Sequence, residues 1–321
     1  MRKYWPALLQ GLLSAFLIYH LFNRTELRHQ AAEVIRLADP AWLALGVVTA
    51  LATESLCAVR WWVILRLFGT PVPLGRVFAF CGAGLFFSLG LPGAAGGDAF
   101  RILYVIRLYP RQKLRASLSV MADRLCGLVA LVIAFVIAVY ARYDLFGHDP
   151  KALLILKAAS LILGGVVFLV SLWWLTTLKP IRSLYLPLES FRKKADRLGH
   201  IFLRIASGPR YVLVGILLSL VALAFHFTTY FCSAKACNLG IRLLDIFTVM
   251  PFIDTLILLP VSLFGIGLRE NLFEQLLAGL FGVTSGAATM TSLGGFGLQA
   301  FVAILGGLLI PFTLPDRKLR D

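Results

Sequence analysis

Apolar residues gather along this chain in runs that are too long for the core of a soluble domain. A helix needs about 20 apolar residues to cross a hydrocarbon layer of about 30 Å. Six runs approach or exceed that length, and none shows the alternation typical of membrane barrel strands. The six predicted spans are Trp5–Phe22, Ala41–Val59, Ala116–Tyr140, Ala152–Thr177, Tyr211–Ala234 and Ala287–Phe312. The pattern predicts an all-α polytopic membrane protein with a single integral membrane domain over residues 1–321.

Two further apolar regions, Val77–Tyr109 and Ile246–Val283, are interrupted near their middle by glycine and proline. Each half has about 15 residues, or about 22 Å of helix, which is short of a full crossing. We therefore predict two re-entrant helical hairpins, each of which enters and leaves on one side. The residues predicted to break the helices are Pro92, Gly93, Gly96, Gly97, Pro260, Gly265 and Gly267.

The cationic residues support this topology, because loops rich in Lys and Arg stay on the cytoplasmic side of a membrane. With two hairpins, 20 of the 31 Lys and Arg residues lie on the side of both termini and eight lie opposite. The basic loop 179–210 contributes a large share and is predicted to be cytoplasmic. Both termini are therefore predicted to lie inside. A full crossing at 77–109 would place Arg107–Arg115 outside and largely remove the bias.

Three arginines, Arg101, Arg124 and Arg269, remain at membrane depth. Two of them follow the breaks, in "LGLPGAAGGDAFR" and "LLPVSLFGIGLRE". Both stretches run from Leu-Pro through glycine-containing chain to an arginine with a carboxylate nearby. The first region enters from the cytoplasm and the second from outside. The match therefore predicts an inverted repeat, a plan typical of transporters that bind their substrate near the midplane.

Ionisable side chains inside a membrane are costly unless paired or hydrated, so they are candidates for function. The three arginines are predicted to bind a headgroup phosphate, because guanidinium offers a fork of donors that matches phosphate. Carboxylates at similar depth are predicted to balance these charges or to exchange protons. They are Asp98, Asp123, Glu270, Glu54, Asp254 and Glu274.

Asp98 is predicted to cap a helix whose N-terminus points toward the membrane interior, with Arg101 on the same face. A helix N-terminus beside a guanidinium suits an anion, although the two residues could equally form a structural pair that holds the break. Asp123 and Arg124 are adjacent and point about 100° apart. One could face a cavity while the other pairs with Asp98 or Arg101, and plain ion pairing between helices is the alternative.

Other classes of function have little support. The net charge of +15 would suggest a nucleic-acid partner in a soluble protein. Here the charge lies mostly in short loops without a nucleic-acid-binding motif, so no such partner is predicted. The sequence has no metal-ligand spacing, cofactor fingerprint or enzyme signature, and we predict no metal, no cofactor and no enzymatic activity. The five cysteines and five histidines are interpreted as packed or interfacial residues, and Trp61 and Trp62 as interfacial anchors.

The stretches "RWWVILR", "LPGAAGGDAFR", "SLSVMADRLCGL" and "LPVSLFGIGLRE" resemble the lysylphosphatidylglycerol synthase transmembrane-region family. That family includes the flippase half of the multiple peptide resistance factor and stand-alone relatives. The resemblance spans nearly the whole chain and implies movement of a lipid between leaflets. The soluble aminoacyl-transferring domain would need a few hundred further residues, so aminoacylation is not expected.

The leading hypothesis is a flippase-like lipid translocase in a bacterial or archaeal cytoplasmic membrane. The expected cargo is an anionic phospholipid or a lipid of the polyprenyl-phosphate type, and a homo-oligomer is compatible with this plan. One alternative is an integral-membrane enzyme that modifies a lipid headgroup. Another is a scaffold for an envelope biosynthetic enzyme.

Overall fold

The computed structural model describes residues 36, 38–89, 95–148, 150–176, 208–258, 265 and 267–313. The predicted span Trp5–Phe22 and nearly all of the basic loop 179–210 lie outside these residues. The predicted helix breakers Pro92, Gly93 and Pro260 lie outside them as well. Every regular element in the described part of the chain is helical, which confirms the all-α prediction there.

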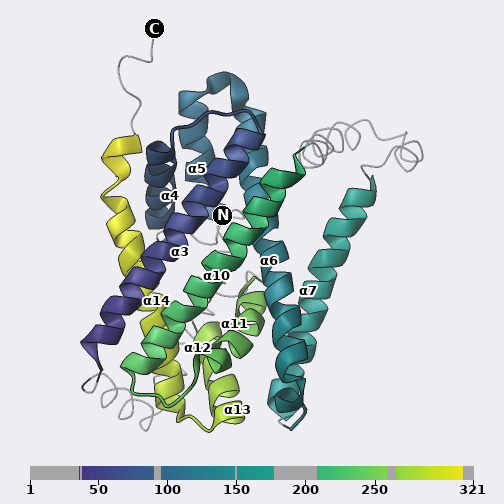
Figure 1. The fold of residues 1–321 in the computed structure, drawn as a ribbon, viewed down its shortest axis with the longest axis vertical. Helices are drawn as coiled ribbons and strands as arrows, with labels where there is room; N and C mark the ends of the chain where they lie inside the picture. Colours follow the sequence, from purple (N-terminus) through teal and green to yellow (C-terminus); the bar gives the residue numbers. More distant parts are fainter. Residues whose placement is uncertain are drawn as a thin grey trace, which may run out of the picture.

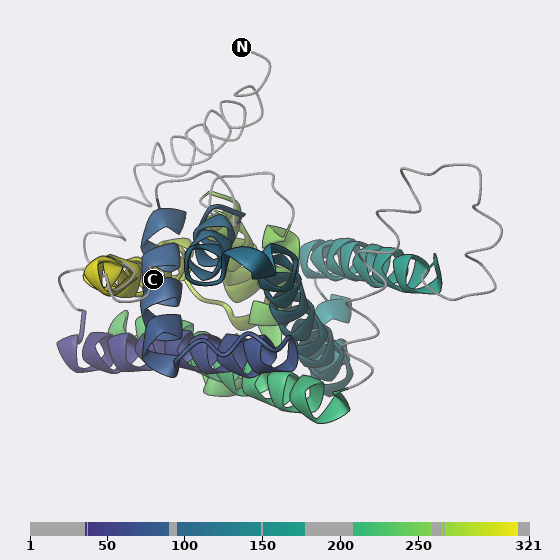
Figure 2. The ribbon, with the colours of Figure 1, turned by 90° about the horizontal axis from the view of Figure 1, so that it is seen from above.

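Two long helices, α3 (Pro40–Leu67) and α10 (Pro209–Ala236), pack extensively against each other. They lie side by side and run in opposite directions (Figure 1). At one end, the Asp39 N–H donates to the Ala236 carbonyl over 3.0 Å. At the other end, Gly208 packs against Leu67. Seen from above, the two helices form one layer, and most of the other helices lie on one side of it (Figure 2).

The first broken region forms a helical hairpin of α4 (Leu74–Ser88) and α5 (Ala95–Leu108). Aromatic rings hold its arms together, because Phe80 stacks on Tyr104 and Phe87 stacks on Phe100. The arms also approach very closely at two glycines. A Cβ atom on Gly97 would lie 2.6 Å from the Gly84 carbonyl oxygen, so a side chain there would force the backbones apart.

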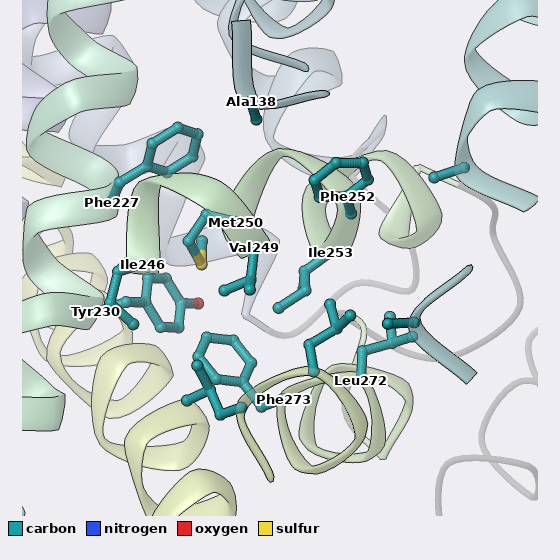
Figure 3. Close-up of a cluster of buried hydrophobic side chains, with 14 of the residues drawn as sticks. Ala138, Phe227, Tyr230, Ile246, Val249, Met250, Phe252, Ile253, Leu272 and Phe273 are labelled. Atoms are coloured by element: carbon teal, nitrogen blue, oxygen red, sulfur yellow. The ribbon is translucent and has the colours of Figure 1, made fainter. Parts of the chain in front are cut away.

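The second broken region begins with α11 (Leu243–Ile257) and continues after its break as α12 (Leu268–Phe273), the π-helix η3 (Glu274–Ala278) and α13 (Gly279–Phe281). Gly265 and Gly267 adopt φ values of 75° and 85°, in the left-handed region that favours glycine. Both arms share a large apolar core. It includes Val249 and Phe252 from α11 and Leu272 and Phe273 from α12 (Figure 3).

The remaining elements are η1 (Pro110–Gln112), α6 (Lys113–His148), α7 (Pro150–Thr176), α14 (Ser285–Gly307) and η4 (Ile310–Thr313). Four stretches are long and apolar enough to cross a membrane: Pro40–Leu67, Pro110–Leu145, Pro209–Ala236 and Ser285–Gly307. They correspond to four of the six predicted spans. The predicted span Ala152–Thr177 forms α7, which packs against α6 and α11.

Many large apolar side chains on these helices face outward. Leu161 on α7 is 78% exposed, Ile137 on α6 is 61% exposed and Val48 on α3 is 59% exposed. Extended apolar surface of this kind is rare on soluble monomers and is typical of helices that are solvated by lipid. The molecule is therefore a multi-pass membrane protein.

The described helices fall into two halves with matching plans. The helices α3 and α10 both have 28 residues and begin with proline, and α4 and α11 both have 15 residues. The same number of residues separates Pro40 from Pro209 as separates Leu74 from Leu243. In each half a hairpin follows the long helix, and the helix α6 or α14 closes the half.

Contacts between the halves match as well. The hairpin arm α4 packs against α14, and its counterpart α11 packs against α6. Likewise, α3 packs against α14, and α10 packs against α6. The long helices of the two halves, α3 and α10, run in opposite directions.

Candidate functional site

A chain of alternating charges crosses the first half of the molecule. It joins three arginines and two aspartates from α3, α5 and α6, in the order Arg60, Asp123, Arg101, Asp98 and Arg124. The closest nitrogen–oxygen distances along it are 2.7, 3.0, 3.3 and 2.7 Å. The first hairpin is thereby tied through α5 to two long helices.

Asp123 is the buried centre of this chain, with only 1% of its side chain exposed. Arg60 donates to both of its carboxylate oxygens, from Nε over 2.7 Å and from Nη2 over 3.1 Å. Arg101 Nη2 donates to Asp123 Oδ2 over 3.0 Å. A forked, charge-assisted pair of this kind offsets part of the cost of taking the charges out of water.

Neighbouring groups fix the two buried guanidinium groups further. Arg60 Nη1 donates to Ser219 Oγ on α10 over 3.0 Å. The guanidinium of Arg101 lies 4.1 Å from the centre of the Trp61 ring, a cation–π contact. The indole N–H of Trp61 in turn donates to Ser119 over 3.2 Å. Contacts with α3, α6 and α10 therefore fix the positions of Arg60 and Arg101 in the charge chain.

The end of the charge chain at Arg124 is exposed. The exposed fraction of the side chain rises from 14% at Arg101 to 52% at Arg124. The Asp98 carboxylate lies between them, and its side chain is 19% exposed.

A cavity of about 140 Å³ adjoins this open end. Its charged lining consists of Glu54, Asp98, Arg101 and Arg124, and the rest of the lining includes thiols and glycines of α3, α4 and α5. Gly84 and Gly97, which allow the hairpin arms to meet, lie in this wall. The first hairpin therefore supplies both the charge and the close backbone packing that shape the cavity.

The second half holds a different polar cluster around Arg269 and Glu270, both buried. The Glu270 carboxylate accepts from the Gly267 N–H at the start of α12 and from Ser292 Oγ, the latter over 3.0 Å. The guanidinium of Arg269 lies 5.1 Å from the centre of the Phe296 ring. Glu270 thus fixes the start of α12 against α14, a capping role that suits a carboxylate.

The last two predicted carboxylates lie elsewhere. Asp254, in the last turn of α11, faces His226 on α10. Glu274, the first residue of the π-helix, lines a second cavity of about 470 Å³ with Lys151, Gln275 and Ser285. The predicted site residues therefore lie in four separate places in the described structure.

The structure corrects several details of the predictions. The predicted span Ala41–Val59 ends too early, because α3 continues to Leu67 with Arg60 inside it. Arg60 was expected in a cytoplasmic loop, but Asp123 neutralises it within the helix bundle. Trp61 was expected at a membrane interface and is instead completely buried.

The predicted role of Asp98 as a helix cap also changes. Asp98 is the fourth residue of α5, inside its first turn and past the cap position, and its carboxylate binds Arg101 and Arg124. As expected, Asp123 pairs with Arg101 while Arg124 lines the cavity, where it also pairs with Asp98. The helix start Ala95 precedes Gly96 and Gly97, so both glycines lie within α5 rather than in the break.

The residues that sequence reasoning missed are Arg60, Ser219, His226 and Gln299. Arg60 had a signal, because apolar sequence continues beyond it and the apolar helix spans Pro40–Leu67. No local pattern marks the other three residues, whose partners lie on distant helices. Among the described residues, no group of three or more His, Cys, Asp or Glu side chains could hold a metal ion.

A comparison with known protein families matches residues 7–307 to the family described as "Lysylphosphatidylglycerol synthase TM region". The chain belongs to the lysylphosphatidylglycerol synthase TM region family. The resemblance seen in the sequence motifs is thereby confirmed over nearly the whole chain. A search of curated proteins finds no match. For this member of the lysylphosphatidylglycerol synthase TM region family, the membership and the apolar helices agree with a lipid-related function in a membrane.

Proposed function

We propose that this protein is a lipid translocase that moves a phosphate-bearing lipid between the leaflets of a bacterial or archaeal cytoplasmic membrane. The observation that carries the proposal is the charge chain whose exposed end lies at a cavity that both Arg101 and Arg124 line. Two guanidinium groups that line one cavity of a lipid-solvated bundle suit the phosphate of an anionic headgroup.

In this proposal Arg101 and Arg124 bind the phosphate, and Asp98 holds the two guanidinium groups apart at a fixed spacing. Arg60 and Asp123 anchor the chain from the buried side. The cavity of about 140 Å³ takes the charged part of a headgroup, while the acyl chains remain in lipid beside the exposed apolar helices. The cargo class is an anionic phospholipid or a polyprenyl-phosphate-type lipid.

The matched halves support the translocation step. The two hairpins are proposed to be re-entrant segments of an inverted repeat, with both termini in the cytoplasm. Arg269 on the second hairpin is the proposed phosphate contact on the other half of the path. A repeat of this kind allows the same packing to open alternately toward either leaflet.

Leaflet exchange in proteoliposomes tests the proposal directly. The purified full chain is reconstituted with fluorescent phosphatidylglycerol, and a membrane-impermeant quencher reports how much label reaches the outer leaflet. Arg101→Ala and Arg269→Ala are expected to abolish exchange. Arg124→Gln is expected to lower it at least about tenfold, because the lost contact is a charge-assisted hydrogen bond to phosphate.

Arg107→Gln is the matched control, because Arg107 is an exposed arginine on the same helix α5. Its exchange rate should equal that of the unmodified protein. Unchanged exchange in Arg101→Ala and Arg124→Gln would overturn the site assignment. Mass spectrometry of the recovered lipid covers the enzymatic alternative, since a modified headgroup would replace transport as the function.

A further inference from the structure

A cavity on the second hairpin is larger than the cavity at the charge chain. Its volume is about 470 Å³, against about 140 Å³ for the cavity beside Arg101 and Arg124. Pockets that enclose a small ligand usually measure about 300–1,000 Å³, a range that the larger cavity reaches. Figure 1 shows α13, whose first residue lines the larger cavity, near the lower end of the molecule and the first hairpin, α4 and α5, in its upper part. The two cavities are therefore separate sites.

Polar and small residues from four helical segments line the larger cavity. They are Lys151, Glu274, Gln275, Ser285, Ala278 and Gly279. Lys151 lies in the first turn of α7, and Ser285 is the first residue of α14. The other four belong to η3 and α13, which follow each other along the chain. The small residues leave the space, and the polar residues supply its chemistry.

The backbone between α13 and α14 fixes one wall of this cavity. Gly282 ends α13 with a φ of 65°, in the left-handed region that favours glycine. Its N–H donates to the Ala278 carbonyl over 3.1 Å, and the Val283 N–H donates to the Leu277 carbonyl over 3.3 Å. Thr284 then caps α14, which packs against η3. The polar first residue of α14 is thereby held close to η3.

Glu274 is the buried acidic group of the site, with 8% of the residue exposed. It begins the π-helix η3, and single π-helical turns are rare and occur frequently at functional sites. An acidic side chain inside a lipid-solvated bundle is also costly unless it is paired or hydrated. Because Glu274 forms part of the cavity wall, it can contact a polar group that enters the cavity.

The side chains of the lining indicate the chemistry of the ligand. An ammonium from Lys151 donates hydrogen bonds, a carboxylate from Glu274 accepts them, and the amide and hydroxyl of the other two polar residues do both. An apolar ligand would displace water from these groups without replacing its hydrogen bonds. A phosphate would meet the carboxylate. A group with several hydroxyls both donates and accepts, so it suits all four side chains.

The second hairpin also connects this cavity with the phosphate contact proposed for that half. Arg269 and Glu274 are five residues apart on the continuous helical segment of α12 and η3, or about 7 Å along its axis. The proposed phosphate contact and the polar cavity therefore lie within two helical turns of each other on the same arm.

We infer that this cavity binds a hydroxyl-rich polar group, such as the glycerol or sugar part of a lipid headgroup, an inference that rests on the proposed lipid translocase function. The arginines bind the phosphate, and the cavity binds the hydroxyl groups that the phosphate carries. Glu274 accepts from a hydroxyl, Lys151 donates to one, and Ser285 does either. The cargo is then narrowed to lipids whose phosphate is joined to glycerol or a sugar.

Binding of soluble headgroup fragments tests the cavity without any lipid. Saturation-transfer NMR of the detergent-solubilised full chain is recorded with glycerol 3-phosphate and with methyl phosphate, which has the phosphate and no hydroxyl-bearing group. Glycerol 3-phosphate should bind at least about fivefold more tightly, because its hydroxyls add hydrogen bonds. Glu274→Gln and Ser285→Ala should each remove most of this preference. Equal binding of the two probes to the unmodified protein would overturn the inference.

Ser117→Ala is the matched control for this measurement. The Ser117 hydroxyl donates to the Lys113 carbonyl of its own helix α6, away from the cavity lining. This variant should keep the full preference for glycerol 3-phosphate. Ser285→Ala changes a half-buried residue at a helix start, so it tests the site even where Glu274→Gln fails to fold.

The role in translocation is tested by leaflet exchange of two lipids that carry a fluorophore on an acyl chain. Phosphatidylglycerol and phosphatidylmethanol have the same single phosphate charge, and only the first has headgroup hydroxyls. Unmodified protein should exchange phosphatidylglycerol at least about fivefold faster. Glu274→Gln and Ser285→Ala should slow phosphatidylglycerol toward the rate of phosphatidylmethanol and leave the latter unchanged.

The inference and the translocase proposal fail differently. Equal exchange of the two lipids by the unmodified protein overturns the inference and leaves the translocase proposal intact. If glycerol 3-phosphate is still preferred in solution, the ligand of the cavity is then a free polyol and not a headgroup. If neither lipid is exchanged, the translocase proposal fails, and the NMR comparison still decides whether the cavity binds hydroxyl groups.

Discussion

The two halves of this molecule share one plan of helices and put it to different uses. The first hairpin carries a chain of charges that ends at a cavity, and the apolar core that its arms join is smaller than that of the second hairpin. The second hairpin is set in the largest core of the structure and keeps its buried glutamate as a helix cap. Under the proposed function, the first half binds the headgroup at the exposed end of the charge chain, and the second half adds a contact from Arg269.

The strongest test of this comparison is Asp123→Ala. The change leaves Arg60 and Arg101 buried without their shared carboxylate, and unpaired buried charges of this kind cost about 3–5 kcal/mol. Thermal unfolding in detergent, followed by tryptophan fluorescence, should show a large loss of stability. Ser219→Ala is the control, because it removes one donor contact of Arg60 and should cost only about 1 kcal/mol. Equal losses in the two variants would show that the carboxylate is not the centre of the network.

The second test concerns the close approach of the hairpin arms. In Gly97→Ala the new Cβ would lie 2.6 Å from the Gly84 carbonyl oxygen and 2.3 Å from Ser88 Oγ. The serine can rotate away, but the backbone oxygen cannot, so we expect a loss of about 1–3 kcal/mol from overpacking. Leaflet exchange should fall as well, since Gly84 and Gly97 line the cavity.

Gly164→Ala on α7 is the matched control for that test. No atom lies within 4 Å of a Cβ at this position. Alanine should therefore stabilise the helix by up to about 1 kcal/mol through its higher helix propensity. If Gly164→Ala loses as much stability as Gly97→Ala, the close contact between the hairpin arms does not explain the loss at Gly97.

Glu270→Gln in the second half is the third test, with a smaller expected effect. The amide keeps the size of the side chain but removes the charge that Gly267 N–H and Ser292 donate to. We expect a loss of about 1–2 kcal/mol, in the range of hydrogen bonds to a charged group. Asp98→Asn lies in the first half, at the open end of the charge chain. Compared with Glu270→Gln, it should lower stability less and lower the rate of leaflet exchange more. The opposite ranking would remove the proposed division between the halves.

The sequence predicted the broad organisation correctly in the described part of the chain, because hydrocarbon constrains it strongly. Apolar runs gave four helices that can cross a membrane, and Gly and Pro gave the positions of the two hairpins. Gly265 and Gly267 were predicted to break a helix, and both adopt positive φ values. Apolar spans and helix breaks can be predicted because they depend on residues that are close together in the sequence.

The site itself could be predicted only in part, because its partners come from separate helices. Asp98, Arg101, Asp123 and Arg124 stand out as charges inside apolar runs. Arg60 was assigned to a loop, since a sequence does not show that Asp123 will neutralise it 63 residues away. The contacts among His226, Asp254 and Gln299 were missed for the same reason, because these residues come from three different helices, α10, α11 and α14. Charges paired over long distances along the chain are therefore where sequence reasoning fails.

The contact between the halves provides the smallest and most specific test. Thr49 on α3 and Thr229 on α10 share a hydrogen bond of 2.9 Å between their hydroxyl groups, both buried. Hydrogen bonds between membrane helices are worth about 0.6 kcal/mol on average, so Thr229→Val should lower stability by about that amount. Thr53→Val is the control, because the Thr53 hydroxyl donates only within its own helix, to the Thr49 carbonyl.

A double variant, Thr49→Val with Thr229→Val, turns this small effect into a measure of how the halves are joined. If the hydroxyl pair joins the halves, the loss in the double variant should be smaller than the sum of the two single losses. Strict additivity would show that each hydroxyl acts only within its own helix. The antiparallel contact of α3 and α10 would then rest on packing alone, and sliding of the halves would meet no hydrogen-bonded barrier at this point.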